Sequence, residues 1–97
     1  MLKVNSTLRE VIAEEVERLS DSRLEMVSIT GVETAPNLRH AVVYIDVLGS
    51  TEASAALEAL QRAARRLQSA IAGQVWMKYT PTLEFEVDPG VDRKSVV

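Results

Sequence analysis

The spacing of apolar residues switches between helical and extended periods along this chain, and the order of these switches limits the folds open to it. Apolar residues three and four positions apart predict a helix from Thr7 to Leu19. Alternating, β-branched stretches predict strands from Met26 to Thr34 and from Leu38 to Leu48. A helical period returns from Thr51 to Ala72, and alternation resumes from Val75 to Val87. This order predicts an α+β fold in which a three-stranded sheet carries helices on one face.

A few residues mark where these elements bend or end. Gly31 interrupts the first strand and predicts a bulge there. Pro81 lacks a ladder donor, so the last strand should bend or lie at an edge near it. No proline interrupts residues 51–72, so the residues alone predict one long helix that ends at Gly73. In the last strand, alternation places Tyr79 with the buried side chains.

The start of the first helix bears on the choice between two folds. Thr7 and Glu10 form a capping-box pattern, which predicts that the helix begins near Thr7. A ferredoxin-like fold would place a strand before this helix, and the leading residues MLKVN are short for one. We therefore rank that fold second.

Composition excludes several classes of function. The 97 residues include no cysteine and a single histidine, and the glycines are too far apart for a phosphate-binding loop. No nucleophile has an evident partner, so we expect no catalysis, no metal and no cofactor. No apolar run reaches the length of a membrane span, and the N-terminal residues do not resemble a signal peptide. We expect a cytoplasmic protein.

Charge is unevenly distributed, although the net charge is only -3. Between Glu58 and Glu84 there is no acidic residue, whereas four basic residues lie in that stretch: Arg62, Arg65, Arg66 and Lys78. Acidic residues concentrate on the first helix, at Glu10, Glu14, Glu15 and Glu17. This distribution predicts a solvated acidic face and a separate face that attracts anions.

The three arginines have the spacing of one helical face. Residues at i, i+3 and i+4 are neighbours on a helix, and guanidinium groups match the oxygens of phosphate. Arg62, Arg65 and Arg66 therefore predict a phosphate-binding patch on the long helix. The alternative is a solubilising surface in which Arg62 pairs with Glu58. Alternation places Trp76 on the face opposite Tyr79, where it covers the end of the long helix or lies exposed, and neither residue is assigned to base stacking.

Three segments in order resemble one known family. In the last strand, MKYTPTLEFEVD, the matching positions are a hydrophobic and a basic residue, then a proline, a Leu-x-Phe step and an aspartate: Met77, Lys78, Pro81, Leu83, Phe85 and Asp88. The segment DSRLEMVSITGVETAPNLRHAVVYI and the alanine-rich LEALQRAARRLQSAIAGQV match in the same order. Together, over residues 5–88, the pattern resembles the ribosome-binding factor A family.

The resemblance implies more than the residues alone. It implies a type II KH-like fold, helix-strand-strand-helix-kink-helix-strand, as a single domain over residues 1–88, followed by a flexible tail over residues 89–97. The family's Ala-x-Gly kink corresponds to Ala63, Ala64 and Arg65, with arginine in place of glycine. Family members continue past the final aspartate with a charged extension, whereas this chain ends at Val97. The implied function is that of an RNA-binding factor that assists assembly of the 30S ribosomal subunit. The resemblance also implies a role in processing the 5′ end of 16S rRNA and in growth in the cold.

The leading hypothesis is therefore a monomeric assembly factor that acts by binding. Its partners would be the small ribosomal subunit, 16S rRNA and ribosomal proteins. We expect no association with a membrane. The predicted RNA contacts are Arg62, Arg65, Arg66, Lys78 and Arg39, with His40 as a further candidate beside Arg39. A second hypothesis is a protein-protein interaction module that docks through its acidic first helix. A third is a ferredoxin-like dimer that senses a small ligand, which would need a fourth strand and an apolar pocket.

Overall fold

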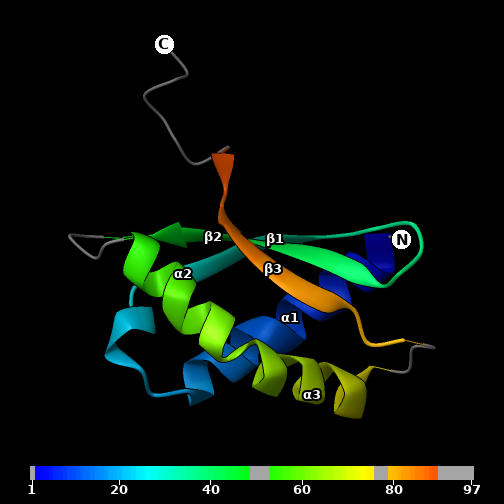
Figure 1. The fold of residues 1–97 in the computed structure, drawn as a ribbon, viewed down its shortest axis with the longest axis horizontal. Helices are drawn as coiled ribbons and strands as arrows, with labels where there is room; N and C mark the ends of the chain where they lie inside the picture. The colour runs from blue at the N-terminus through cyan, green and yellow to red at the C-terminus, as the bar shows by residue number, and fades with distance from the viewer. Residues whose placement is uncertain (1, 49–52, 76–78, 90–97) are drawn as a thin grey trace.

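The computed structural model describes residues 2–48, 53–75 and 79–89 (Figure 1). Trp76 and Lys78 lie outside these ranges, as does most of the expected tail. The elements in chain order are α1 (Leu2–Arg18), the 3-10 helix η1 (Ser22–Leu24), β1 (Val27–Thr34), β2 (His40–Val47), α2 (Ala53–Arg62), α3 (Ala64–Gln74) and β3 (Thr82–Val87).

The three strands form one mixed sheet in the order β1-β2-β3. β1 and β2 pair antiparallel as a hairpin, whereas β2 and β3 pair parallel. Parallel neighbours need a crossover connection, and α2 and α3 supply it. The three α-helices all lie on the same side of the sheet (Figure 1). The predicted α+β architecture is confirmed, and the arrangement is consistent with the KH-like order.

The predicted bulge in β1 is present. Ile29 pairs with Ile45 and Gly31 pairs with Tyr44, so Thr30 is the extra residue between them. The Thr30 hydroxyl lies 2.7 Å from Oδ2 of Asp88 and 3.2 Å from the Tyr44 carbonyl oxygen. The bulge thus aims a β1 side chain across the sheet towards the end of β3.

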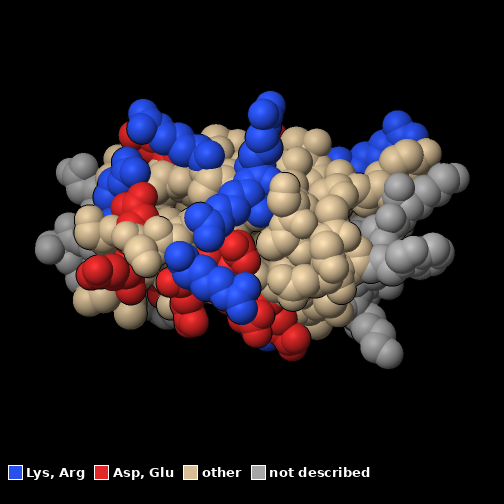
Figure 2. Space-filling model, turned by 90° about the horizontal axis from the view of Figure 1, so that it is seen from below, with Lys and Arg blue, Asp and Glu red and all other residues tan. Residues whose placement is uncertain are grey.

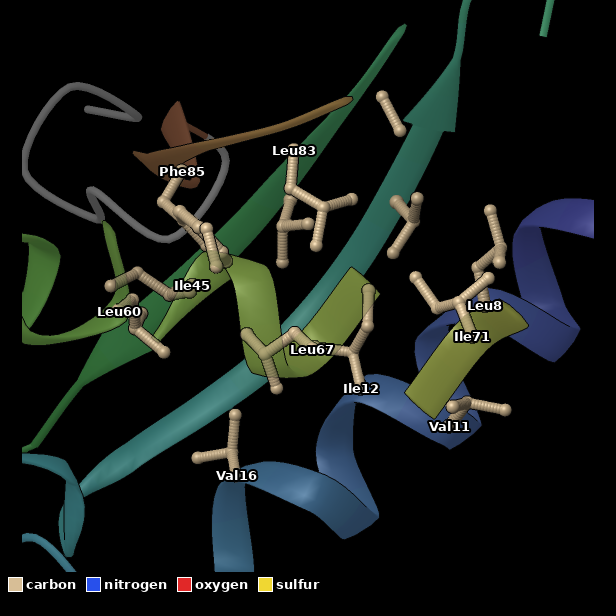
Figure 3. Packing of buried hydrophobic residues seen from close by; sticks show 14 of the residues in the cluster. Leu8, Val11, Ile12, Val16, Ile45, Leu60, Leu67, Ile71, Leu83 and Phe85 are labelled. Atoms are coloured by element: carbon tan, nitrogen blue, oxygen red, sulfur yellow. The ribbon is translucent and has the colours of Figure 1, made fainter. Parts of the chain in front are cut away.

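The core lies between the sheet and the helices (Figure 3). Its largest fully buried apolar side chains come from α1, from the sheet, and from both helices of the crossover. They are Leu8, Ile12, Val43, Ile45, Leu60, Leu67, Ile71 and Leu83, joined by Pro81. Leu60 precedes the junction of α2 with α3 and Leu67 follows it, so both sides of that junction are anchored in the core.

The first helix begins five residues earlier than its capping pattern predicted. α1 starts at Leu2 rather than at Thr7, so the prediction that a capping box at Thr7 begins the helix is wrong. Asn5 lies within the helix, where its side-chain oxygen accepts hydrogen bonds from the Thr34 amide at 3.2 Å and the Thr34 hydroxyl at 2.6 Å. This contact with β1 stabilises the first turn. Because residues 2–6 are helical, the ferredoxin-like alternative with a strand there is also wrong.

The single long helix predicted from the residues alone is wrong, and the kink implied by the family resemblance is confirmed. The break falls at Ala63, whose φ of -89° and ψ of 2° lie outside the α-helical range. Its amide lies 3.1 Å from the Ala59 carbonyl oxygen and 3.0 Å from that of Leu60. α2 then packs against η1 and β3, while α3 packs against α1. One straight helix could not follow both surfaces.

Two further boundaries differ from the sequence-based expectation. Gly73 does not end α3, which continues to Gln74, and the Val75 amide donates to the Ile71 carbonyl oxygen at 2.8 Å. β3 begins only at Thr82, directly after Pro81, which has no amide hydrogen to donate. Tyr79 therefore lies before the strand and is 41% exposed, so its expected burial is wrong.

The remaining strand ends shift by one or two residues. β1 begins at Val27 rather than Met26, and β2 begins at His40 rather than Leu38. Leu38 has a φ of 64°, which is a left-handed turn conformation rather than a strand conformation. Leu48 follows the end of β2 and is 53% exposed.

Candidate nucleic-acid interface

The three predicted arginines lie around the break between α2 and α3. Arg62 is the last residue of α2, whereas Arg65 and Arg66 belong to the first turn of α3. All three are exposed. The single continuous helical face expected for them is wrong, because the break at Ala63 separates Arg62 from the other two. The structure nevertheless keeps all three at one junction.

Arg62 already has an acidic neighbour on its own helix. Its Nη2 lies 3.4 Å from Oε2 of Glu58, so the predicted alternative pairing is confirmed. The side chains of Arg62 and Glu58 are 71% and 61% exposed. Exposed pairs of this kind contribute little to stability and exchange easily. Arg62 can therefore leave Glu58 for another anion at small cost.

Arg66 is held by a buried carboxylate from α1. Its Nε donates to Oε2 of Glu15 at 3.2 Å, and Nη1 of Arg18 donates to the other oxygen at 3.4 Å. The Glu15 side chain is only 10% exposed, so its assignment to a solvated acidic face is wrong. The signal was present in the sequence, since Glu15 follows Leu8 by two helical turns and falls within the apolar stripe of α1.

Arg65 differs from its two neighbours in having no ion pair with any residue that the structure describes. It is exposed in the first turn of α3. Arg65 is therefore the arginine of this cluster whose charge is not offset by an ion pair within the described residues.

Arg39 and His40 lie elsewhere, at the loop before β2 and at its first residue. The Arg39 guanidinium stacks over the Tyr79 ring, 4.2 Å from the ring centre. His40 Nε2 lies 3.3 Å from Oε1 of Glu84 on β3. Sequence reasoning missed the contact of Arg39 with Tyr79, because no local pattern joins two residues so far apart. Lys78, the remaining predicted contact, falls outside the described residues.

Charges of both signs meet on the helical side of the molecule. Figure 2 views this side and shows basic side chains lying against acidic ones. The pairs formed by Arg62 and Arg66 account for part of this pattern. The expected anion-attracting face is thus a small cluster beside an acidic helix.

Neither a metal site nor a membrane-spanning helix is found in the described part of the chain. No group of three or more histidine, aspartate or glutamate side chains there could hold a metal ion. None of the described helices has the length and apolar character needed to cross a membrane.

The family model for ribosome-binding factor A matches residues 1–97. The chain belongs to the ribosome-binding factor A family. Among similar members, ribosome-binding factor A of Rubrobacter xylanophilus is 45% identical over 92 residues, covering 94% of this chain and 75% of the relative. The homologue from Rhodopirellula baltica is 39% identical over 99 residues and covers 100% and 72%.

Solved structures of ribosome-binding factor A share the fold. The crystal structure from Thermus thermophilus has a TM-score of 0.84 at 34% identity, covering 89% of this chain and 93% of the other. A homology model of Thermus thermophilus ribosome-binding factor A, fitted into a cryo-EM map of its 30S complex, has a TM-score of 0.74 at 34% identity and covers 89% of this chain and 92% of the other. These matches support the α+β arrangement of ribosome-binding factor A in this chain.

Proposed function

We propose that this protein binds the small ribosomal subunit and assists maturation of 16S rRNA, including its 5′ end, by binding and without catalysis. Membership in the ribosome-binding factor A family supports the proposal, as does the 30S complex into which the Thermus thermophilus relative was fitted. The role in RNA processing and in growth in the cold is proposed from the resemblance to the family.

The arginine cluster at the α2-α3 junction is the observation that carries the proposal. Arg65 is exposed and makes no ion pair with a described residue, and Arg66 is held in place by Glu15. Arg62 can exchange its solvent-exposed partner Glu58 for a phosphate. Three guanidinium groups around one helix start suit the backbone of folded RNA, where phosphate contacts set position and RNA shape sets specificity.

The charge balance limits how this binding works. The chain carries a net charge of -3, and acidic residues lie beside the arginines. A few phosphate contacts in such a field give weak affinity for isolated RNA. We therefore infer that tight binding needs the preorganised surface of the subunit, and that the protein favours one RNA conformer by binding it.

The test is co-sedimentation with purified small subunits across a salt series. The test variant combines Arg62→Gln, Arg65→Gln and Arg66→Gln, and the charge-matched control combines Arg9→Gln, Arg18→Gln and Arg23→Gln. We expect the wild type and the control to bind in a salt-dependent manner and the test variant to lose binding while staying folded. Absence of wild-type binding at low salt would contradict the proposal. Equal loss in both variants would assign the effect to net charge.

An acidic stripe on α1 favours a second candidate, docking to a basic protein partner. Glu10, Glu14 and Glu17 are exposed at spacings of four and three residues, and none forms an ion pair with a described residue. If this stripe carried subunit binding, combining Glu10→Gln with Glu14→Gln would abolish co-sedimentation. The arginine variant would then still bind.

A further inference from the structure

Helix α1 closes only one end of the outer edge of β1. At the C-terminal end of the strand, Asn5 caps the Thr34 amide at 3.2 Å. At the other end, an open hollow of about 370 Å³ separates α1 from the strand. Its apolar lining comes from α1, from η1 and from the strand itself: Ala13, Val16, Leu24, Val27 and Ile29. The helix and the strand therefore form a groove that is closed at one end and open at the other.

The register of the hairpin decides which backbone groups of β1 lie along this groove. β1 lies at the edge of the sheet, and β2 is its one partner among the described strands. The Leu48 amide donates to the Met26 carbonyl oxygen at 3.0 Å, which makes these two residues a hydrogen-bonded pair. In an antiparallel ladder such pairs alternate, so the next one joins Ser28 with Asp46.

It follows that the N–H and C=O groups of Val27 and Ile29 point away from β2, towards the open edge. Both residues also line the hollow. Two residues of strand backbone are therefore placed to pair with another extended segment, next to a space for its side chains.

The charge around the hollow determines which kind of extended peptide segment would bind there. Its lining includes the acidic residues Glu17, Asp21 and Glu25, and no lysine or arginine of the described chain lines it. Asp21 is engaged by Arg23, whose Nη2 lies 2.9 Å from its carboxylate. Glu17 and Glu25 are exposed and form no ion pair with a described residue. Two exposed carboxylates in the lining of this hollow favour cationic side chains and repel a phosphate backbone.

We propose that the open half of the β1 edge binds an extended peptide rich in arginine or lysine, which adds to the sheet as a further strand. The aliphatic stem of a basic side chain would lie on Val16 and Leu24, and its charged end would reach Glu17 and Glu25. Backbone pairing would involve Val27 and Ile29. This site lies at the sheet edge opposite β3 and uses none of the arginines at the helix junction. It therefore stands independently of the proposed RNA contact.

The first test uses the full chain and the synthetic peptide acetyl-Thr-Arg-Thr-Arg-Thr-Arg-Thr-amide in an NMR titration. We expect amide shifts confined to residues 13–29 and hydrogen exchange of the Val27 and Ile29 amides slowed by about tenfold at saturation. A peptide with glutamate in place of arginine should give no shifts. A peptide N-methylated at alternate amides on the pairing edge should bind much more weakly. Equal binding of the methylated peptide would overturn the strand-pairing part of the proposal.

The second test changes the protein at exposed positions, so the fold is kept. Combining Glu17→Gln with Glu25→Gln should weaken peptide binding about fivefold, because two partly solvated ion pairs are lost. The matched control, Glu84→Gln with Glu86→Gln on β3, removes the same charge outside the hollow and should leave affinity unchanged. No shifts at millimolar peptide, shifts centred on α2 and α3, or equal effects of the two double variants would each overturn the proposal.

Discussion

The side chains of Glu15 and Arg66 tie α1 to α3 across 51 positions of sequence, through a hydrogen bond of 3.2 Å from Nε of Arg66. Because Nε makes this bond, the two Nη groups of Arg66 are not used by it, and the arginine side chain stays 57% exposed. A nearly buried carboxylate thus orients an arginine whose outer nitrogens face solvent. The contact joins the packing of two helices to the candidate RNA surface.

The variant Glu15→Gln should lower the free energy of unfolding by about 1 kcal/mol, because it weakens two charge-assisted hydrogen bonds made partly in solvent. Urea unfolding monitored by circular dichroism measures this change. Glu14→Gln is the matched control, since Glu14 is the exposed neighbour on the same helix, and it should change the stability by less than about 0.5 kcal/mol. Equal effects of the two variants would show that the ion pairs of Glu15 add nothing.

Among single arginine variants, Arg65→Gln should reduce the salt dependence of subunit binding the most. Arg65 has no internal carboxylate partner among the described residues, whereas Arg62 must give up Glu58 to bind phosphate. Loss of one phosphate contact should lower the slope of log affinity against log salt by roughly 0.7 to 0.9. Co-sedimentation of Arg65→Gln and Arg62→Gln at four salt concentrations gives both slopes. A steeper loss for Arg62→Gln would reverse this ranking.

The helix break should not depend on a glycine at position 65. The break forms at Ala63 with arginine at position 65, so Arg65→Gly gains no conformational relief there. Arg65 lies in the first turn of α3, where glycine should still make the protein about 0.5 kcal/mol less stable than alanine does, the low end of the cost in a helix interior. Chemical denaturation of Arg65→Gly beside Arg65→Ala measures the difference. A glycine variant more stable than the alanine variant would indicate strain at the break.

Stability in acid should depend on Asp21, which caps η1. Hydrogen bonds from the Arg23 side chain and backbone hold the pKa of the Asp21 carboxyl below its ordinary value of 3.8. The folded protein therefore binds this proton less readily than the unfolded chain does. The contribution is present above pH 3.8 and is lost as the pH falls through the lowered pKa of the folded state.

The variant Asp21→Asn should accordingly show a smaller loss of stability on acidification below pH 3.8 than the wild type. Urea unfolding at a series of acidic pH values measures the two slopes. Glu10→Gln serves as a control, because Glu10 is exposed on α1 and forms no ion pair with a described residue. Parallel curves for Asp21→Asn and wild type would contradict the prediction.

The sequence alone could predict the elements whose pattern is local. Alternation identified both hairpin strands, and Gly31 marked the bulge beside Thr30. Prediction from the sequence failed where a contact between residues far apart in the chain determines the local structure. The early start of α1 involves Asn5 and its partner Thr34 on β1. The break at Ala63 carries no glycine or proline as a signal, so only the family resemblance indicated it.

The candidate site was predictable in the same partial way. Spacing brought the three arginines to one region of the fold, and the pair of Arg62 with Glu58 followed from their separation by four residues. Periodicity could not show that Arg66 is held by Glu15, because that partner lies on another helix. Alternation also gave the wrong burial for Tyr79. The alternating pattern applies only within a strand, and β3 begins at Thr82, after Pro81.

Anchoring of the helix junction in the core leads to the strongest expected effect on stability. Leu67 is fully buried just after the break, and its amide donates to the Ala63 carbonyl oxygen at 3.0 Å. Leu67→Ala should cost about 2 to 5 kcal/mol through lost burial and a cavity, a large share of the roughly 5 to 15 kcal/mol expected for a domain of this size. Leu48→Ala, at a 53% exposed position, should cost less than about 1 kcal/mol. Urea unfolding with an unchanged m-value measures both, and equal midpoints would show that Leu67 does not anchor α3.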